Sequence, residues 1–168
     1  MTFESRIFST LRAAVVASAA VSSIAFAGPT SVPFKATLVT QEQLLFDSTI
    51  CQAAPYLVGV TTGSGQASHM GAISGVSSDC VTPTSPYTYS FTNGKVTLTA
   101  ANGDELRAEY SGSLSPTATP PIYSIADSYR ITGGTGRFVG ANGSGTLQGI
   151  ENLQTGQGQL QLTGTISY

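Results

Sequence analysis

Hydrophobic and polar residues alternate with a period of two through much of the chain after residue 32. This alternation is typical of β-strands that bury one face and leave the other in solvent. Six runs show it clearly, at 34–39, 87–92, 96–100, 105–110, 123–131 and 159–166. Three further segments have strand-like composition, at 57–62, 66–76 and 144–150. The pattern therefore predicts eight or nine strands, separated by Gly, Pro and Asn-Gly.

Three stretches interrupt this pattern. Residues 41–54 are less regular, and a short helical turn is predicted there. Residues 82–86 and 115–121 are rich in proline, which cannot donate a hydrogen bond within a central ladder. We expect both proline-rich stretches to be loops.

The register of one hairpin can be chosen from the sequence. A two-residue turn between 96–100 and 104–110 would pair Leu98 with Arg107 and mix apolar with charged positions. A three-residue loop with Gly103 in the left-handed conformation pairs Leu98 with Leu106 and keeps one face apolar. The second register is predicted. It also implies an exposed ion pair between the two strands, Lys95 with Glu109.

Antiparallel strands joined by Gly-rich turns form either a sandwich or a closed barrel. Glycines within strand-like segments favour the barrel, because its strands must bend sharply; these are Gly59, Gly71, Gly75, Gly149 and Gly164. The chain has the length of one domain. We therefore expect an all-β antiparallel barrel of eight or nine strands spanning 28–168.

The N-terminus predicts export. Arg6 and Arg12 precede an apolar run that ends in Ala25-Phe26-Ala27, the small-x-small pattern that signal peptidase accepts. The run of about fifteen residues is shorter than the roughly 20 that a spanning helix needs, although an uncleaved anchor is the alternative. We expect residues 1–27 to be a signal peptide and the mature protein to be secreted or periplasmic.

Export determines how the two cysteines are interpreted. Cys51 and Cys80 form an even pair in an oxidising compartment, so a disulfide is expected. Two buried free thiols are the alternative. A catalytic thiol is not expected, since no Lys or Arg lies near either residue in the sequence to lower its pKa.

Composition excludes several classes of function. The net charge of −2 offers no large basic surface for nucleic acid. One histidine and two cysteines do not supply a four-ligand zinc site. We expect no metal, no cofactor and no stable insertion into a membrane.

The run ITGGTGRFVGANG at 131–143 is the most distinctive motif, with Gly133, Gly134, Gly136 and Phe138. It resembles the G-G-T-G-x-F segment of the dirigent and allene oxide cyclase superfamily and of its bacterial secreted relatives. Residues 65–71 and 98–104 are similar to stretches of those relatives. The resemblance implies an eight-stranded barrel around a cavity for an apolar small molecule, and it allows a homo-oligomer. It carries over no catalytic residues.

The same glycines do not indicate a phosphate-binding loop. Such a loop requires an amphipathic helix after the glycines, and a P-loop requires a lysine as well. Here more strand pattern follows instead. We expect a tight turn, with Phe138 closing one end of the barrel.

Asp127 is the main candidate for chemistry, because the alternation places it on one face with the apolar residues Tyr123, Ile125, Tyr129 and Ile131. If that face is interior, burial raises the pKa of the carboxyl group. The group would then suit acid–base chemistry or binding of a ligand hydroxyl. The alternative is a bulge that turns Asp127 outward, or an arginine partner.

His69 and four tyrosines complete the candidate residues. His69 shares a predicted face with Ala67 and Gly71 and is a candidate general base, or an anchor at the cavity mouth. A structural hydrogen bond is the alternative. The candidate ligand-binding tyrosines are expected to line the core or cavity; they are Tyr87, Tyr89, Tyr110 and Tyr129.

The expected function is that of an exported barrel that binds a small apolar or amphipathic molecule in its cavity. One alternative is a cofactor-free cyclase or isomerase of the allene oxide cyclase or dirigent type, acting by confinement and one or two polar groups. The pattern is also compatible with a small outer-membrane barrel, or with a filled, purely structural barrel.

Overall fold

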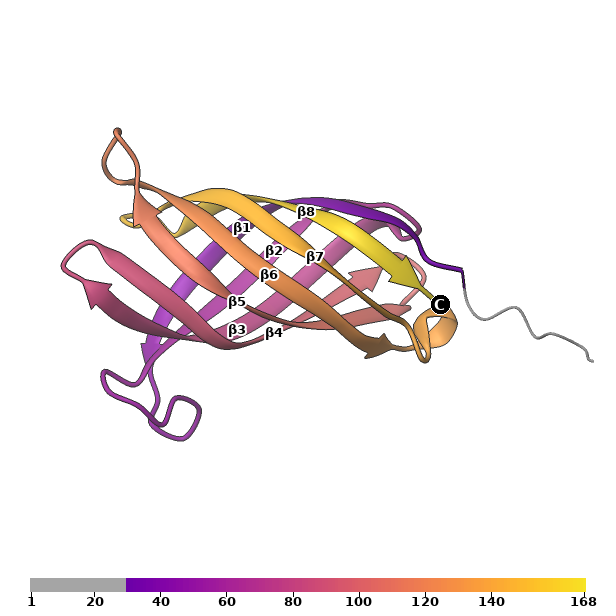
Figure 1. The fold of residues 1–168 in the computed structure, drawn as a ribbon, viewed down its shortest axis with the longest axis horizontal. Coiled ribbons are helices and arrows are strands. Elements are labelled where there is room, and N and C mark those ends of the chain that lie inside the picture. Colours follow the sequence, from indigo (N-terminus) through magenta and orange to yellow (C-terminus); the bar gives the residue numbers. More distant parts are fainter. Residues whose placement is uncertain (1–29) are drawn as a thin grey trace, which may run out of the picture.

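Eight antiparallel strands close into a barrel in the computed structural model, which describes residues 30–168 (Figure 1). The all-β, eight-stranded prediction is confirmed. The predicted signal peptide at 1–27 lies outside the described residues. In chain order the strands are β1 (Val32–Phe46), β2 (Leu57–Ala67), β3 (Gly71–Ser85), β4 (Thr88–Ala100), β5 (Glu105–Pro116), β6 (Ile122–Gly134), β7 (Asn142–Asn152) and β8 (Gln157–Ser167).

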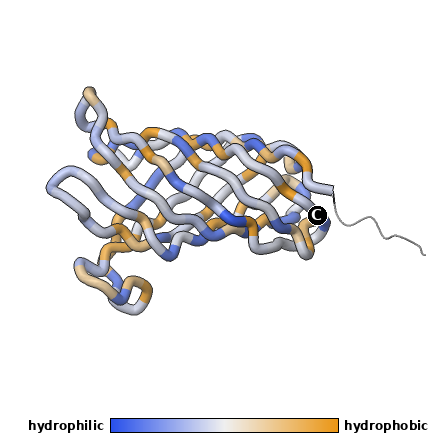
Figure 2. The backbone as a smooth tube through the Cα atoms, viewed as in Figure 1, coloured by the Kyte–Doolittle hydropathy of each residue, from blue (hydrophilic) through white to orange (hydrophobic). Residues whose placement is uncertain are grey.

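Each strand pairs with its neighbours in sequence, and β1 pairs with β8 to complete the ring. Closure leaves no strand edge open to pairing with another chain. Hydropathy varies over short distances along the strands (Figure 2), as expected when successive side chains face opposite sides. Every second side chain therefore points into the barrel.

The predicted register of the β4–β5 hairpin is confirmed. Leu98 lies opposite Leu106, and Val96 lies opposite Ala108. Gly103 has a φ of +87°, in the left-handed region that the three-residue loop requires.

The predicted ion pair in this hairpin is wrong. Lys95 lies opposite Glu109, but the Glu109 carboxylate binds Arg130 of β6, with 2.8 Å between Arg130 Nη2 and Glu109 Oε2. Arg130 is the partner of Glu109 in the β5–β6 register, and the guanidinium fork matches carboxylate geometry better than an ammonium does.

Two predicted boundaries are wrong: one strand extends further than its local pattern indicates, and a turn divides another predicted strand. Residues 41–54 were expected to be irregular, but β1 continues to Phe46 along β2. Residues 66–76 were expected to form one strand, but a turn at 68–70 separates β2 from β3. His69 lies in this turn with a φ of +65°, so it does not share a strand face with Ala67 and Gly71.

The proline-rich loops are shorter than predicted. β3 continues through Pro83 to Ser85, and β5 ends at Pro116. These prolines lie near strand ends, where few ladder hydrogen bonds remain to be lost.

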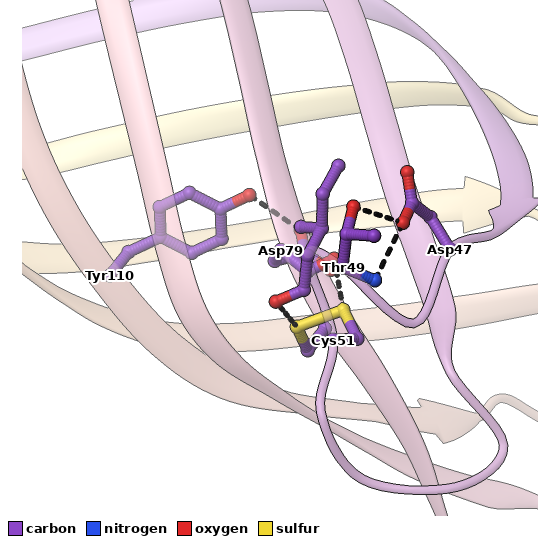
Figure 3. Close-up of a disulfide and its surroundings, with 7 residues drawn as sticks. Asp47, Thr49, Cys51, Asp79 and Tyr110 are labelled. Carbon is purple, nitrogen blue, oxygen red and sulfur yellow. Dashed lines mark hydrogen bonds between the residues drawn. A yellow bond between two sulfur atoms is a disulfide. The ribbon is translucent and has the colours of Figure 1, made fainter.

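The predicted disulfide between Cys51 and Cys80 is confirmed. It lies on the outer face of the barrel, where the β1–β2 loop covers Val58. Val58 is fully buried there, although it faces outward from β2. The disulfide therefore fastens this loop to β3, immediately beside Asp79 (Figure 3).

One end of the barrel is densely packed, and we call it the packed end. It carries both described termini and the turn at 133–141, including the short 3-10 helix η1 (Gly136–Phe138) (Figure 1). Phe34, Phe138 and Ile166 are at most 1% exposed there. Gly134 packs so closely on Phe138 that a side chain at 134 would collide with it. The opposite end, with the β1–β2, β3–β4, β5–β6 and β7–β8 connections, we call the far end.

The outward positions are mainly Ser, Thr and Gln. The five Lys and Arg residues within 30–168 are all exposed: Lys35, Lys95, Arg107, Arg130 and Arg137. Across these residues the chain contains no helix with the length and apolar character that a membrane crossing would need.

Candidate functional site

The candidate site is a cavity inside the barrel, between the packed end and the far end. Apolar residues from five strands form much of its wall: Leu38, Phe91, Leu98, Ile125, Leu147 and Leu162. The cavity has a volume of about 80 Å³, counted as the space open to the centre of a water-sized sphere. Since one water needs roughly 10–15 Å³ by this measure, the cavity has space for several waters or one small organic molecule.

Four carboxylic acids also line the cavity, and each comes from a different strand. They are Glu42 of β1, Asp79 of β3, Asp127 of β6 and Glu151 of β7. Each occupies an inward position of its strand, at even spacing from apolar residues of the same strand such as Leu38, Val81 and Leu147. Burying four acids together is costly unless each is neutral or paired, so their partners determine what the site can do.

Asp79 is held by a tyrosine. The Tyr110 hydroxyl donates a hydrogen bond to Asp79 Oδ2, at 2.5 Å (Figure 3). Burial raises the pKa of Asp79 to about 7, although the hydrogen bond from Tyr110 lowers it in part. Burial also raises the pKa of the Tyr110 hydroxyl, which therefore keeps its proton. Asp79 Oδ1 is buried without a partner.

Local structure creates the space for this pair. The β3–β4 and β4–β5 registers shift around Asp79 and Gly94, where β4 bulges. The Tyr110 ring lies so close to Gly94 that a side chain there would overlap it. Bulges re-aim side chains in this way and are common beside functional sites.

Asp127 lies on the interior face, as the alternation predicts, and is 9% exposed. Its carboxyl group rests against Gly112, its partner in the β5–β6 register, where any side chain would collide with it. Burial raises the pKa of Asp127 to about 7, the charge of Asp79 raises it further, and a hydrogen bond from the Ser113 backbone opposes both. Asp127 Oδ1 has no partner.

Glu42 and Glu151 form a second acid pair, next to Asp79. Their carboxyl groups lie close enough to interact, and a hydrogen bond between two carboxyl groups forms only when one of them holds a proton. Burial raises the pKa of both, and the bond raises that of Glu42 further. Gly59 leaves room for this arrangement, since a side chain there would strike the Glu42 carboxyl group and come within 3.0 Å of Asp79.

Tyr129 presents a third unpartnered oxygen. The residue is 4% exposed, lines the cavity, and its hydroxyl has no hydrogen-bond partner. The hydroxyl lies against Gly145 and Gly164 of β7 and β8, which have no side chain to obstruct it. Burial raises the pKa of this hydroxyl, so it remains a neutral donor and acceptor.

The structure separates the remaining sequence candidates from the cavity. His69 lies in an exposed turn at the packed end, where its ring nitrogen is 2.9 Å from the Pro33 carbonyl oxygen. This residue therefore makes a structural hydrogen bond and does not reach the cavity. Tyr87 is 68% exposed in the β3–β4 turn, and Tyr89 packs beside Tyr123 towards the far end. Only Tyr110 and Tyr129 of the four tyrosines line the cavity.

The sequence reasoning missed Glu42, Asp79 and Glu151. The alternation could have identified Glu42 as an inward residue, because it follows Phe34, Ala36 and Leu38 at even spacing. That signal was lost because 41–54 was interpreted as irregular. Asp79 was missed because it lies beyond the end of the predicted 66–76 strand.

Within residues 30–168, no three acids, histidines or cysteines are placed to hold one metal ion. Comparison with family models, with curated proteins and with solved structures gives no match. The site must therefore be interpreted from its own chemistry: a small, mostly apolar cavity with four carboxylic acids and two tyrosine hydroxyls in its wall.

Proposed function

We propose that this protein is an exported barrel that binds one small amphipathic molecule in the interior cavity. The observation that carries the proposal is the combination of an apolar cavity wall with three buried, unpartnered oxygens, on Asp79, Asp127 and Tyr129. Buried polar atoms without partners are rare and costly, and ligand sites join an apolar lining to a few such groups.

Several features support export and a soluble barrel. The apolar run at 13–27 and the disulfide are both typical of exported proteins. The outward Ser, Thr and Gln residues differ from the apolar band that faces lipid in outer-membrane barrels. The closed eight-stranded barrel is also the architecture implied by the resemblance of the 131–143 motif to the dirigent and allene oxide cyclase superfamily.

The experiment is native mass spectrometry of the exported protein, combined with an NMR titration using cyclohexanol. We expect a bound small molecule, or shifts confined to cavity residues. Thr61→Phe, which fills the cavity, should abolish both, whereas Thr97→Phe on β4 outside the cavity lining should not. A bare mass together with no cavity shifts in the wild-type protein would refute the proposal.

A second candidate function is cofactor-free proton transfer of the cyclase or isomerase kind. The observation that favours it is that burial raises the pKa values of Asp79 and Asp127 to about 7. A group with such a pKa can both donate and accept a proton near neutral pH. With an enzyme, Asp127→Asn would abolish turnover and retain substrate binding; with a carrier, it would only weaken binding.

A further inference from the structure

The acids of the cavity have no basic partner. Every Lys and Arg within 30–168 is exposed, and His69 lies in an exposed turn. The titratable groups that face the cavity are acids and phenols only: Glu42, Asp79, Tyr110, Asp127, Tyr129 and Glu151. The strands β2, β4 and β8 contribute no titratable group to its lining. Any negative charge inside the barrel therefore lacks a counter-charge from these residues.

Three oxygens of the cavity wall receive no hydrogen bond from the described residues. Asp79 is 5% exposed and Asp127 is 9% exposed, and each has one carboxyl oxygen without a hydrogen bond. The Tyr129 hydroxyl is likewise buried and unpartnered, and Tyr129 follows Asp127 by two residues on the inward face of β6. Leaving such groups unsatisfied costs stability, and a ligand with N–H groups would satisfy them.

We infer that the cavity binds a small organic cation, a protonated amine whose hydrocarbon part lies against Leu38, Leu98 and Leu162. This inference rests on the proposed function and specifies the ligand class. An ammonium group carries three donors and no acceptor, which matches a cluster that offers acceptors and no cation. A compact aliphatic amine also matches the size of the cavity.

Ligand binding and proton release are coupled at this site. Asp79 and Asp127 titrate near pH 7 in the empty barrel, because burial and the charges of neighbouring acids oppose their ionisation. A bound cation removes that opposition, so both acids lose protons as the amine enters. Below about pH 5 the acids are neutral and the cation gains much less.

The test compares cyclohexylamine with cyclohexanol, which has a similar shape and no charge. Both are titrated into the full mature protein by calorimetry at pH 8, pH 7 and pH 5, in two buffers that differ in ionisation enthalpy. At pH 8 we expect the amine to bind about ten-fold more tightly than the alcohol or better, as for charge-assisted hydrogen bonds. At pH 5 the preference should shrink to about three-fold or less. At pH 7 the two buffers should reveal proton release.

Substitutions of single acids test which residues cause the preference for the amine. Asp79→Asn and Asp127→Asn keep the size of the side chain, and each should remove most of the preference for the amine. Glu109→Gln, on the outer face, is the matched control and should bind as the wild type does. Thermal unfolding of each variant establishes that it is folded before its binding is interpreted.

The outcomes separate this inference from the proposed function. Equal binding of amine and alcohol would overturn the cation inference and leave the binding barrel intact. Tight amine binding that neither Asp variant weakens would place the site elsewhere and also overturn the inference. Failure of both probes to bind, with no molecule found by native mass spectrometry, would overturn both proposals.

Discussion

The packed end and the cavity occupy the same barrel interior but differ in chemistry. At the packed end, inward strand positions carry Phe34 and Ile166, which are at most 1% exposed, and Phe138 of η1 is fully buried. In the cavity, inward positions of β1, β3, β6 and β7 carry carboxylic acids, with leucines nearby in the lining and polar atoms left unpaired. The strand residues of both regions follow one alternation, so the difference between them lies in which residues occupy the inward positions.

This difference indicates that one region stabilises the fold and the other is suited to function. Burial of large apolar side chains stabilises the fold, and buried unpaired acids oppose it. Proteins tolerate such local cost mainly at functional sites, where it is offset elsewhere in the structure. The packed end therefore offsets the unfavourable free energy of burying the acids. Substitutions in the two regions should change the free energy of unfolding in opposite directions.

The largest expected effect is a loss of stability as the pH rises. Asp79 and Asp127 have pKa values near 7 in the folded protein and 3.8 in the reference state. Between about pH 4 and pH 7 the folded state holds protons that the unfolded state has released. Stability is therefore highest below this window and falls as the pH rises through 7, by about 4 kcal/mol for either acid.

Thermal unfolding at pH 4.5, 6 and 8 measures this effect. The melting temperature should fall by about 10 °C or more across the series. The double variant Asp79→Asn with Asp127→Asn should reduce the dependence, and the part that remains belongs to Glu42, whose pKa burial raises to about 8. A melting temperature that rises towards pH 8 in the wild type would mean that these acids are not buried as described.

Truncation at the packed end should be nearly as costly. Phe138→Ala removes a fully buried ring and should destabilise the protein by about 3–5 kcal/mol at any pH. Phe46→Ala at the far end is the matched control, because Phe46 is 79% exposed; its cost should stay below about 0.5 kcal/mol. Chemical denaturation measures both, and similar losses from the two variants would break the contrast between the ends.

Removing the tyrosine hydroxyl that holds Asp79 should have a smaller effect that depends on pH. Tyr110→Phe leaves Asp79 Oδ2 without its donor, at a cost of about 1–3 kcal/mol at pH 8, where Asp79 is ionised. At pH 4.5 the carboxyl group is neutral and the cost should be smaller. Tyr89→Phe, outside the cavity lining, should cost little at either pH, as denaturant titrations would reveal.

The smallest effect concerns an acid on the outer face. Glu109→Gln breaks an exposed ion pair with Arg130, and the change in unfolding free energy should be below about 0.5 kcal/mol. The same exchange of acid for amide at Asp127 should stabilise the protein at pH 8. If both exchanges had the same effect, burial would not distinguish the two acids.

Much of this architecture was accessible from the sequence, because its signals are local. Alternation between apolar and polar residues predicts the strands, and the spacing of Leu98 and Leu106 around Gly103 predicts one hairpin register. Asp127 was identified by parity alone, as an acid among apolar residues of β6. The disulfide followed from two cysteines in a chain that its N-terminal sequence predicts to be exported.

The tertiary structure alone decided which residues meet in the cavity. Glu42, Asp79, Asp127 and Glu151 are scattered over more than a hundred residues of sequence, and only closure of β1 against β8 brings their strands round one interior. Strand ends were decided there too, because pairing with neighbours extends β1 beyond the point where its local pattern fades. The alternation of apolar and polar residues is a property of a single segment, so the sequence by itself determined which residues share a face of each strand. Convergence and burial are properties of the closed ring, so the environment of each acid, and with it its pKa, belongs to the folded barrel.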